Sequence, residues 1–162
     1  MAKKKPAKQL PGAYRKVVAR NKRARHDYFL GESWEAGLIL LGSEVKSLRG
    51  GRASIGEAYA RMRGDELWLI NANIPEYAHA NRFNHDPTRD RKLLLRRAEL
   101  NKLAQRTKKS AGTIVPLELF FNERGKVKIT IALGTGKRQH DKRQTLKRAD
   151  AQREMDRVRK SH

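Results

Sequence analysis

The fold is decided by two stretches late in the chain, IVPLELFF at residues 114–121 and KVKITIAL at residues 126–133. In the second stretch, every other residue is apolar, which is the period of a strand with one buried face. Four residues that end in Gly125 separate the stretches, and this spacing predicts a β-hairpin. Pro116 has no backbone N–H to donate, so it predicts an edge strand or a bulge at that point.

Three segments upstream also have strand character. Residues 17–19 are a short apolar run, and residues 28–41 are aromatic and aliphatic, with Gly31 and Gly37 as expected bends or bulges. Residues 55–63 and 66–73 predict a second hairpin, for which Gly64 and Asp65 supply a tight turn. Residues 74–90 lack periodicity and predict a long loop.

Two segments predict helices. Residues 42–51 form a short one, with Ser43 as the N-cap and Gly50 and Gly51 as the stop. Residues 91–110 form a longer one, capped by Thr88 or Asp90 at its start and by Gly112 at its end. The expected fold is therefore mainly β with helices (α+β), an OB-like antiparallel β-barrel flanked by two or three helices.

The chain is strongly basic. Its 162 residues include 38 Lys and Arg against 17 Asp and Glu, a formal net charge of +21. Nucleic acid is the expected partner of such a chain, and a membrane surface is the second choice. No stretch has the length of a membrane span, and the N-terminal lysines are not followed by an apolar signal core. The absence of cysteine excludes disulfides and thiolate metal sites and fits a reducing cytoplasm.

The charge divides the chain into three expected parts. Residues 1–12 read as a flexible basic arm, residues 13–133 as the barrel, and residues 134–162 as a basic tail. The tail has too few apolar groups to offset the entropy of ordering, so we expect it to be disordered when free and helical when bound. Gly134 and Gly136 are expected to make residues 134–143 a hinge between barrel and tail.

Two clusters of residues are candidates for RNA contact. The first is the basic run at residues 21–26, in which the cations would meet phosphates and the imidazole would stack on or hydrogen-bond a base; it consists of Asn21, Lys22, Arg23, Arg25 and His26. The second is Lys126 and Lys128, which would also attract phosphates. Glu35 lies in an apolar run. It is either an outward-facing strand residue or a carboxylate that accepts from a base or ribose hydroxyl, or that orients an arginine.

Other functions find less support. A metal site at His79, His85 and Asp86 is disfavoured, because no regular spacing makes these side chains converge, and a loop histidine beside RNA is the preferred reading. A nuclease would need clustered carboxylates or a histidine pair, and the chain offers only scattered candidates such as His85-Asp86 and His140-Asp141. A ribosomal protein or nonspecific nucleic-acid chaperone stays open. We expect no catalytic residue, no metal and no cofactor.

Several ordered motifs resemble one known family. They are the run at residues 21–28, Glu35-Ala36-Gly37-Leu38, Glu44-Val45-Lys46-Ser47-Leu48-Arg49, Asp86-Pro87-Thr88-Arg89, Arg91-Lys92-Leu93-Leu94-Leu95, and Gly136-Lys137 through His140-Asp141-Lys142-Arg143. From about Ala19 to the tail, the chain is similar to the bacterial SsrA-binding proteins, also called small protein B. The loop at residues 77–85 differs more and carries no assigned contact.

The resemblance implies a cytoplasmic RNA-binding factor, not an enzyme, and we expect the protein to be a monomer. Members bind the tRNA-like domain of transfer-messenger RNA and deliver it to stalled ribosomes, which rescues the ribosome and tags the nascent peptide for degradation. By position, Asn21, Glu35, Leu94 and Lys126 match residues tied to RNA binding. The tail would probe the empty decoding centre and mRNA channel through its motif, which comprises Gly136, Lys137, Arg138, His140, Asp141, Lys142 and Arg143.

Overall fold

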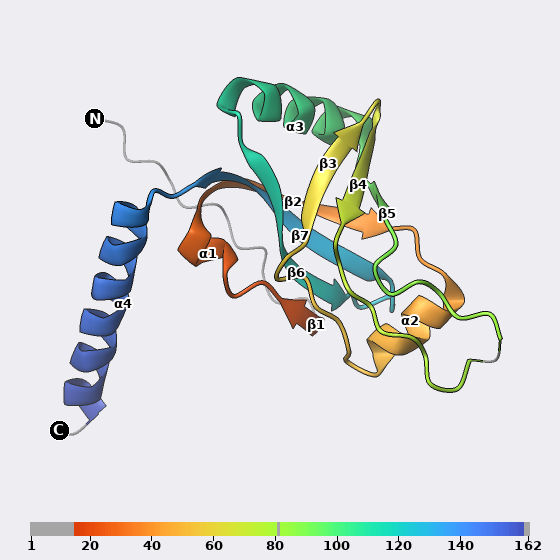
Figure 1. Cartoon of the computed structure of the whole chain (residues 1–162), viewed down its shortest axis with the longest axis horizontal. Coiled ribbons are helices and arrows are strands. Elements are labelled where there is room, and N and C mark those ends of the chain that lie inside the picture. The colour runs from red at the N-terminus through yellow and green to blue at the C-terminus, as the bar shows by residue number, and fades with distance from the viewer. Residues whose placement is uncertain (1–14, 81, 161–162) are drawn as a thin grey trace.

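The computed structural model describes residues 15–80 and 82–160, except for the side chains of His140 and Lys160. The predicted arm at residues 1–12 lies outside the described residues. Seven strands and four helices occur in the described part (Figure 1). In chain order they are β1 (Lys16–Arg20), α1 (Ala24–Asp27), β2 (Tyr28–Leu38), α2 (Gly42–Arg49), β3 (Tyr59–Arg63), β4 (Glu66–Ile70), β5 (Arg91–Leu94), α3 (Arg97–Ser110), β6 (Thr113–Phe121), β7 (Val127–Gly136) and α4 (Gln139–Lys160).

The strands form an antiparallel barrel, as the sequence predicts. Their order is β1-β6-β3-β4-β5-β2-β7, and a further pairing of β6 with β7 closes the ring. One edge of β6 pairs with β7 along its whole length. The other edge is shared, because β1 pairs with its C-terminal half and β3 meets it only at Ile114. Closure leaves few unpaired strand edges, and β1 extends the wall outside the ring.

The β6–β7 hairpin is confirmed, and so is the bulge at its proline. The register of the two strands shifts between Pro116 and Glu118. Gly125 has a φ of 68° in the connecting turn, where its N–H donates to the Asn122 carbonyl at 2.9 Å. The apolar side chains of β7 point inward, and Ile129 and Ile131 are fully buried. The two-residue period of the sequence is thus the inside–outside alternation of the barrel wall.

The boundary between barrel and tail is later than predicted. Strand β7 does not end at Leu133 but continues to Gly136, which pairs with Tyr28 of β2. Gly134 is buried, and a Cβ atom there would lie 3.0 Å from the Cβ atom of Tyr28. This glycine therefore permits close approach of two strands and is not a hinge.

Helix α2 begins without the predicted serine cap. Leu41 is the N-cap residue, and its N–H donates to the Glu44 carboxylate at 2.7 Å. Ser43 bonds His85 instead, with 2.9 Å between the hydroxyl and Nδ1. The helix ends at Arg49 with Gly50 as its C-cap, which confirms the predicted glycine stop, and Leu48 packs into the core with no exposed surface.

The predicted helix at residues 91–110 was wrong in its first six residues. Residues 91–94 form strand β5, in which Arg91 and Leu93 are buried and alternate with Lys92 and Leu94. The strand pairs with β4 and β2, so tertiary pairing overrides the helical period here. Helix α3 begins after Arg96, and neither Thr88 nor Asp90 caps it. It ends at Ser110, and its C-cap is Ala111, where φ is 46°, and not Gly112.

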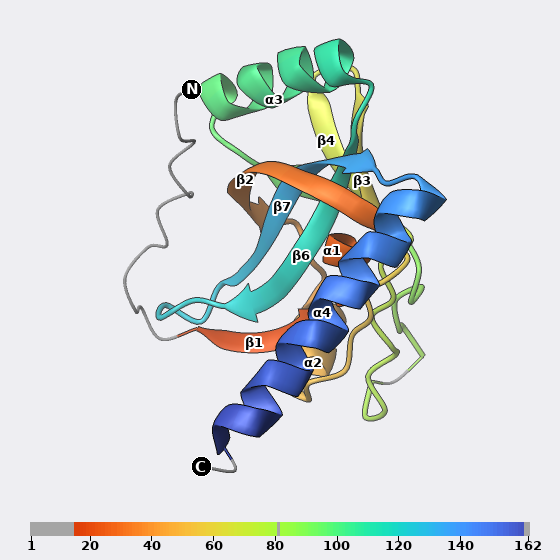
Figure 2. The same ribbon diagram turned by 90° about the vertical axis from the view of Figure 1, so that its left-hand side faces the viewer.

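The helices lie at different places around the barrel. Helix α3 crosses one end and α2 lies toward the opposite end, as both views show (Figures 1 and 2). Leu103 of α3 and Leu48 of α2 are fully buried, so each helix contributes to the core. Helix α4 leaves the barrel beside α1 and stands clear of it (Figure 1). None of its described side chains is buried.

Candidate nucleic-acid interface

One candidate surface is a shallow groove where β2, β5 and the β6–β7 turn meet. Its floor is apolar and includes Leu38, Val45 and Leu94, and its rim carries Lys126 and Lys128. Leu94 is 48% exposed, so it is not a core residue and is accessible for a contact. An apolar floor with cations at its rim suits a nucleotide, because a base can cover the floor while the phosphate meets the lysines.

Glu35 lies on the outer face of the same wall. Its carboxylate is 3.0 Å from Nη2 of Arg15, and the Arg15 guanidinium lies 4.5 Å from the centre of the Phe120 ring. The outward orientation predicted for Glu35 is therefore confirmed. Of the roles that the sequence left open for Glu35, the geometry favours orienting an arginine. Arg15 itself was not anticipated from the sequence.

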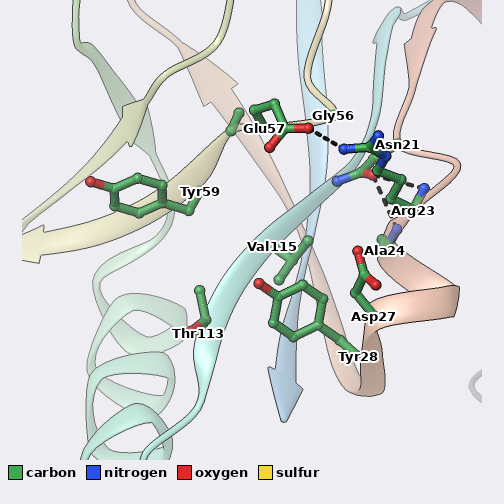
Figure 3. Close-up of a pocket in the computed structure, with 11 residues that line it drawn as sticks. Asn21, Arg23, Ala24, Asp27, Tyr28, Gly56, Glu57, Tyr59, Thr113 and Val115 are labelled. Carbon is green, nitrogen blue, oxygen red and sulfur yellow. Dashed lines mark hydrogen bonds and ion pairs between the residues drawn. The ribbon is translucent and has the colours of Figure 1, made fainter. Parts of the chain in front are cut away.

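A second surface is the corner around α1 (Figure 3). Asn21 is only 8% exposed, and all its polar side-chain atoms have partners within the protein. Its Nδ2 donates to the Pro116 carbonyl at 3.1 Å, while its Oδ1 accepts from the N–H groups of Arg23 and Ala24 at 3.1 and 3.0 Å. Asn21 thus fixes the first turn of α1 against β6. This gives it a positioning role for the basic run.

The basic side chains of this corner point outward. Lys22, Arg23 and Arg25 are exposed, and Arg23 pairs with Glu57 across the pocket drawn in Figure 3. This pocket holds about 190 Å³ and is also lined by Tyr28 and by other residues of α1, β3 and β6. The cations predicted to contact phosphates are accessible, but the charge of Arg23 is partly neutralised by the Glu57 carboxylate.

Asp27 joins this corner to the tail. Its carboxylate accepts from His26 Nδ1 at 2.9 Å and from Lys142 Nζ at 3.1 Å. These hydrogen bonds, from His26 and then Lys142, hold the pKa of Asp27 below its ordinary value. The Asp27 carboxylate is therefore charged at neutral pH and keeps both contacts. The stability that these contacts contribute is lost as pH falls through the lowered pKa of Asp27. His26 thus shares an anion with the tail, which was not foreseen.

Lys137 makes further contacts between body and tail. Its N–H donates to the Asp27 carbonyl at 2.9 Å, and its Nζ donates to the Arg25 carbonyl at 2.8 Å. The Nζ also lies 4.9 Å from the centre of the Phe29 ring. Lys137 and Lys142 of the tail motif therefore lie beside α1. Asp27, the first acidic residue in the chain, was the available sequence signal for this junction.

Other described residues of the tail motif differ in their exposure. Gly136 ends β7, and Arg138 and Arg143 are exposed, whereas Asp141 is half-buried. His140 lies in α4, and its side chain is not among those described. Further along α4, Leu146 and Met155 are 50% and 64% exposed. Disorder of the free tail stays a prediction.

The two candidate surfaces lie at opposite ends of β2. Tyr28, at its start, lines the α1 pocket, and Leu38, at its end, lines the groove. Eleven residues of strand span about 30 Å, less any bend. Glu35 lies between them. The sequence-predicted residues are therefore not one cluster, and an RNA that touches all of them must follow this wall of the barrel.

The loop histidine reading is wrong for His85. This side chain is 4% exposed, and its Nε2 lies 2.9 Å from the Ile74 carbonyl. His79 instead meets the Tyr77 ring edge-on, with 5.5 Å between ring centres. Within residues 15–80 and 82–160, no three His, Asp or Glu side chains come together to hold a metal ion. No helix of that described part is long and apolar enough to cross a membrane.

Comparison with known proteins identifies the family. The family described as SmpB protein matches residues 18–161. The SsrA-binding protein of Sphingomonas elodea is 51% identical over 154 residues, which cover 94% of this chain and 96% of that relative. The SsrA-binding protein of Rhodopseudomonas palustris (strain TIE-1) is 53% identical over 146 residues, which cover 90% and 93%.

A solved structure agrees with these relatives. It is described as "tmRNA-SmpB: a journey to the center of the bacterial ribosome", and its matching chain has a TM-score of 0.64 and 43% sequence identity. The match covers 80% of this chain and 94% of that chain. The chain therefore belongs to the SmpB family of SsrA-binding proteins.

Proposed function

We propose that the protein binds the tRNA-like domain of transfer-messenger RNA and accompanies it to stalled ribosomes in the bacterial cytoplasm. The observation that carries this proposal is the 51% identity to an SsrA-binding protein along nearly the whole of both chains. The solved complex of a relative with tmRNA and the ribosome supports the same partners. The protein is an RNA-binding factor and not an enzyme.

The groove supplies a physical basis for RNA binding. Lys126 and Lys128 would neutralise phosphates, and Leu94 would receive the face of a nucleotide. Arg15, oriented by Glu35, adds a fixed cation on the adjoining wall. The exposed cations of α1 would meet a second part of the same RNA, beyond the other end of β2.

The finer proposal concerns the tail. Helix α4 is joined to the body through few contacts and exposes most of its length, so it is free to enter a negatively charged channel. We infer that it probes the empty decoding centre and mRNA channel, where Arg138, His140 and Arg143 would meet ribosomal RNA. The rescued ribosome would then resume on the transfer-messenger RNA and tag the nascent peptide for degradation.

The groove predicts a specific salt dependence. Replacing Lys126 and Lys128 together with alanine is expected to weaken binding to transfer-messenger RNA, because two phosphate contacts are lost. The slope of log affinity against log salt should become shallower by about 1.5. Electrophoretic mobility or fluorescence anisotropy at several salt concentrations measures it.

A matched control has the same loss of charge elsewhere. Lys108 and Lys109, both exposed at the end of α3, lie away from the groove, and their replacement with alanine should leave the slope nearly unchanged. If both double variants lower affinity and slope equally, the groove is not the binding surface.

A further inference from the structure

The loop between β4 and β5 projects beside α2 as a separate feature (Figure 1). Near its end, Phe83 is 91% exposed, the most of any large apolar side chain in the described part of the chain. A single exposed apolar side chain is common and needs no function. Here, however, two further features accompany it, namely hydrogen bonds that pin the neck of the loop and cations on the loop and on α2.

The neck of the loop is held by specific contacts. At its base, the N–H of Ile74 donates to the Pro87 carbonyl at 2.9 Å, and the buried His85 fills the space between Ser43 and Ile74. Farther out, the Asn84 amide donates to the Tyr77 carbonyl at 3.0 Å. It also accepts from the N–H of Tyr77 at 3.2 Å.

These contacts prearrange the residue that precedes Asn84. The Asn84 amide stands in for a strand partner, so the two arms of the loop are pinned to each other. The side chain of Phe83 is therefore presented to solvent from an anchored position. Prearrangement lowers the entropic cost of any contact that this ring makes.

The surroundings of the loop are basic. Lys46 of α2 lies 5.7 Å from the Tyr77 ring, and Arg82, which precedes Phe83 in the chain, is exposed. Glu76 is the one acid in residues 75–84. The nearby Asp86 carboxylate accepts from the N–H and the hydroxyl of Thr88, at 2.8 and 3.1 Å. An exposed ring on a loop that also carries cations suits a nucleotide, because the ring stacks on the base and the cations meet its phosphate.

We propose that Phe83 is a stacking platform for an unpaired RNA base, resting on the RNA-binding role proposed above for the choice of nucleic acid. Helix α2 connects this loop to the groove, since Val45 lines the groove and Lys46 reaches Tyr77. The loop therefore extends the RNA surface past α2. The base comes from transfer-messenger RNA or from ribosomal RNA, and the chemistry of the contact is the same for both.

The test compares three substitutions at one exposed position. Phe83→Ala removes the ring, Phe83→Leu keeps an apolar side chain without a π face, and Phe83→Trp keeps a larger π face. The first arm measures affinity for transfer-messenger RNA alone. The second measures binding of small ribosomal subunits by the protein already complexed with that RNA. Because Phe83 makes no core contact, unchanged thermal unfolding should confirm that all variants fold.

Stacking predicts a clear order. Phe83→Ala and Phe83→Leu should each lose affinity by about tenfold in one arm, and that arm identifies the source of the base. Phe83→Trp should bind like the unchanged protein, and RNA should quench its fluorescence beyond the background of Trp34 and Trp68. Wild-type affinity of Phe83→Ala in both arms, or of Phe83→Leu in the arm where Phe83→Ala fails, would overturn the stacking role. If the unchanged protein binds neither probe, the proposed function itself fails.

Discussion

Ending the chain after Arg138 is expected to leave RNA binding largely intact and to abolish ribosome rescue. The cut removes α4 but keeps all of β7, whose last residue, Gly136, pairs with Tyr28. The lost contact of Lys142 with Asp27 is a partly exposed ion pair, and such pairs contribute about 1 kcal/mol or less. Affinity for transfer-messenger RNA at physiological salt should therefore fall by less than about fivefold.

Rescue should fall to the level seen without the protein, because the segment proposed to enter the mRNA channel is gone. A reconstituted translation reaction on a message without a stop codon measures tagged peptide. The double alanine variant of Lys126 and Lys128 is the complementary control. It should rescue ribosomes once its concentration is high enough to saturate the transfer-messenger RNA. The truncated chain should not rescue ribosomes at any concentration. A truncated chain that has lost most of its affinity would show that α4 is part of the RNA-binding surface.

Replacing Arg91 with alanine is expected to cost about 3–5 kcal/mol of unfolding free energy. Arg91 and Glu44 are both fully buried, with 2.8 Å between Arg91 Nε and Glu44 Oε1. The guanidinium also donates to the carbonyls of Ala72, Arg89 and Pro87, at 2.7, 2.9 and 3.0 Å. Alanine would leave these buried acceptors without a donor and would open a large cavity between α2, β4 and the long loop.

The carboxylate side of this network has a clear pH dependence. Burial raises the pKa of Glu44, but hydrogen bonds from Arg89, the Leu41 N–H and Arg91 outweigh it, so the pKa lies below its ordinary value. Its stabilising contribution is therefore present at neutral pH and is lost as pH falls through the lowered pKa.

Chemical denaturation at pH 7 measures the Arg91→Ala change. Lys92→Ala is a matched control on the same strand, because Lys92 pairs with Glu66 at the surface, and it should cause only a small part of the loss. Arg91→Met fills part of the space and should recover stability relative to alanine. Equal denaturation midpoints for Arg91→Ala and Lys92→Ala would contradict the role given to the buried network.

The hairpins were predictable from sequence because their signals are local. The alternation around Ile129 and Ile131, the turn at Gly125 and the bulge at Pro116 all follow from residues within a few positions of one another. The same holds for Lys126 and Lys128, which adjoin that turn.

Strand β5 was not predictable in this way. Arg91 looks like a polar helix residue in sequence, and it is buried only because Glu44 lies opposite it in the fold. The helical period of the leucines downstream then extended the predicted helix over the strand. The decisive contact lies 47 residues away along the chain, beyond any local pattern.

The site residues divide in the same manner. Exposed cations such as Lys22 and Arg25 were identified correctly as accessible, because a charged side chain without a buried partner usually lies at the surface. Asn21 was assigned a contact with RNA, yet its amide bonds the Pro116 carbonyl of the neighbouring strand β6. The exposure of Leu94 and the junction between Asp27 and Lys142 likewise depend on how distant segments meet.

The central claim is that the barrel selects one structured RNA and is not a general nucleic-acid binder. A competition experiment tests it directly. Labelled transfer-messenger RNA is bound to the full-length protein at physiological salt and is then challenged with unlabelled transfer-messenger RNA or with bulk transfer RNA. Specific binding typically exceeds nonspecific binding by about 10³-fold or more. We therefore expect bulk transfer RNA to displace the labelled RNA only when it is present at about 10³-fold higher concentration than the unlabelled transfer-messenger RNA that does so. Displacement by both competitors at similar concentrations would contradict the account.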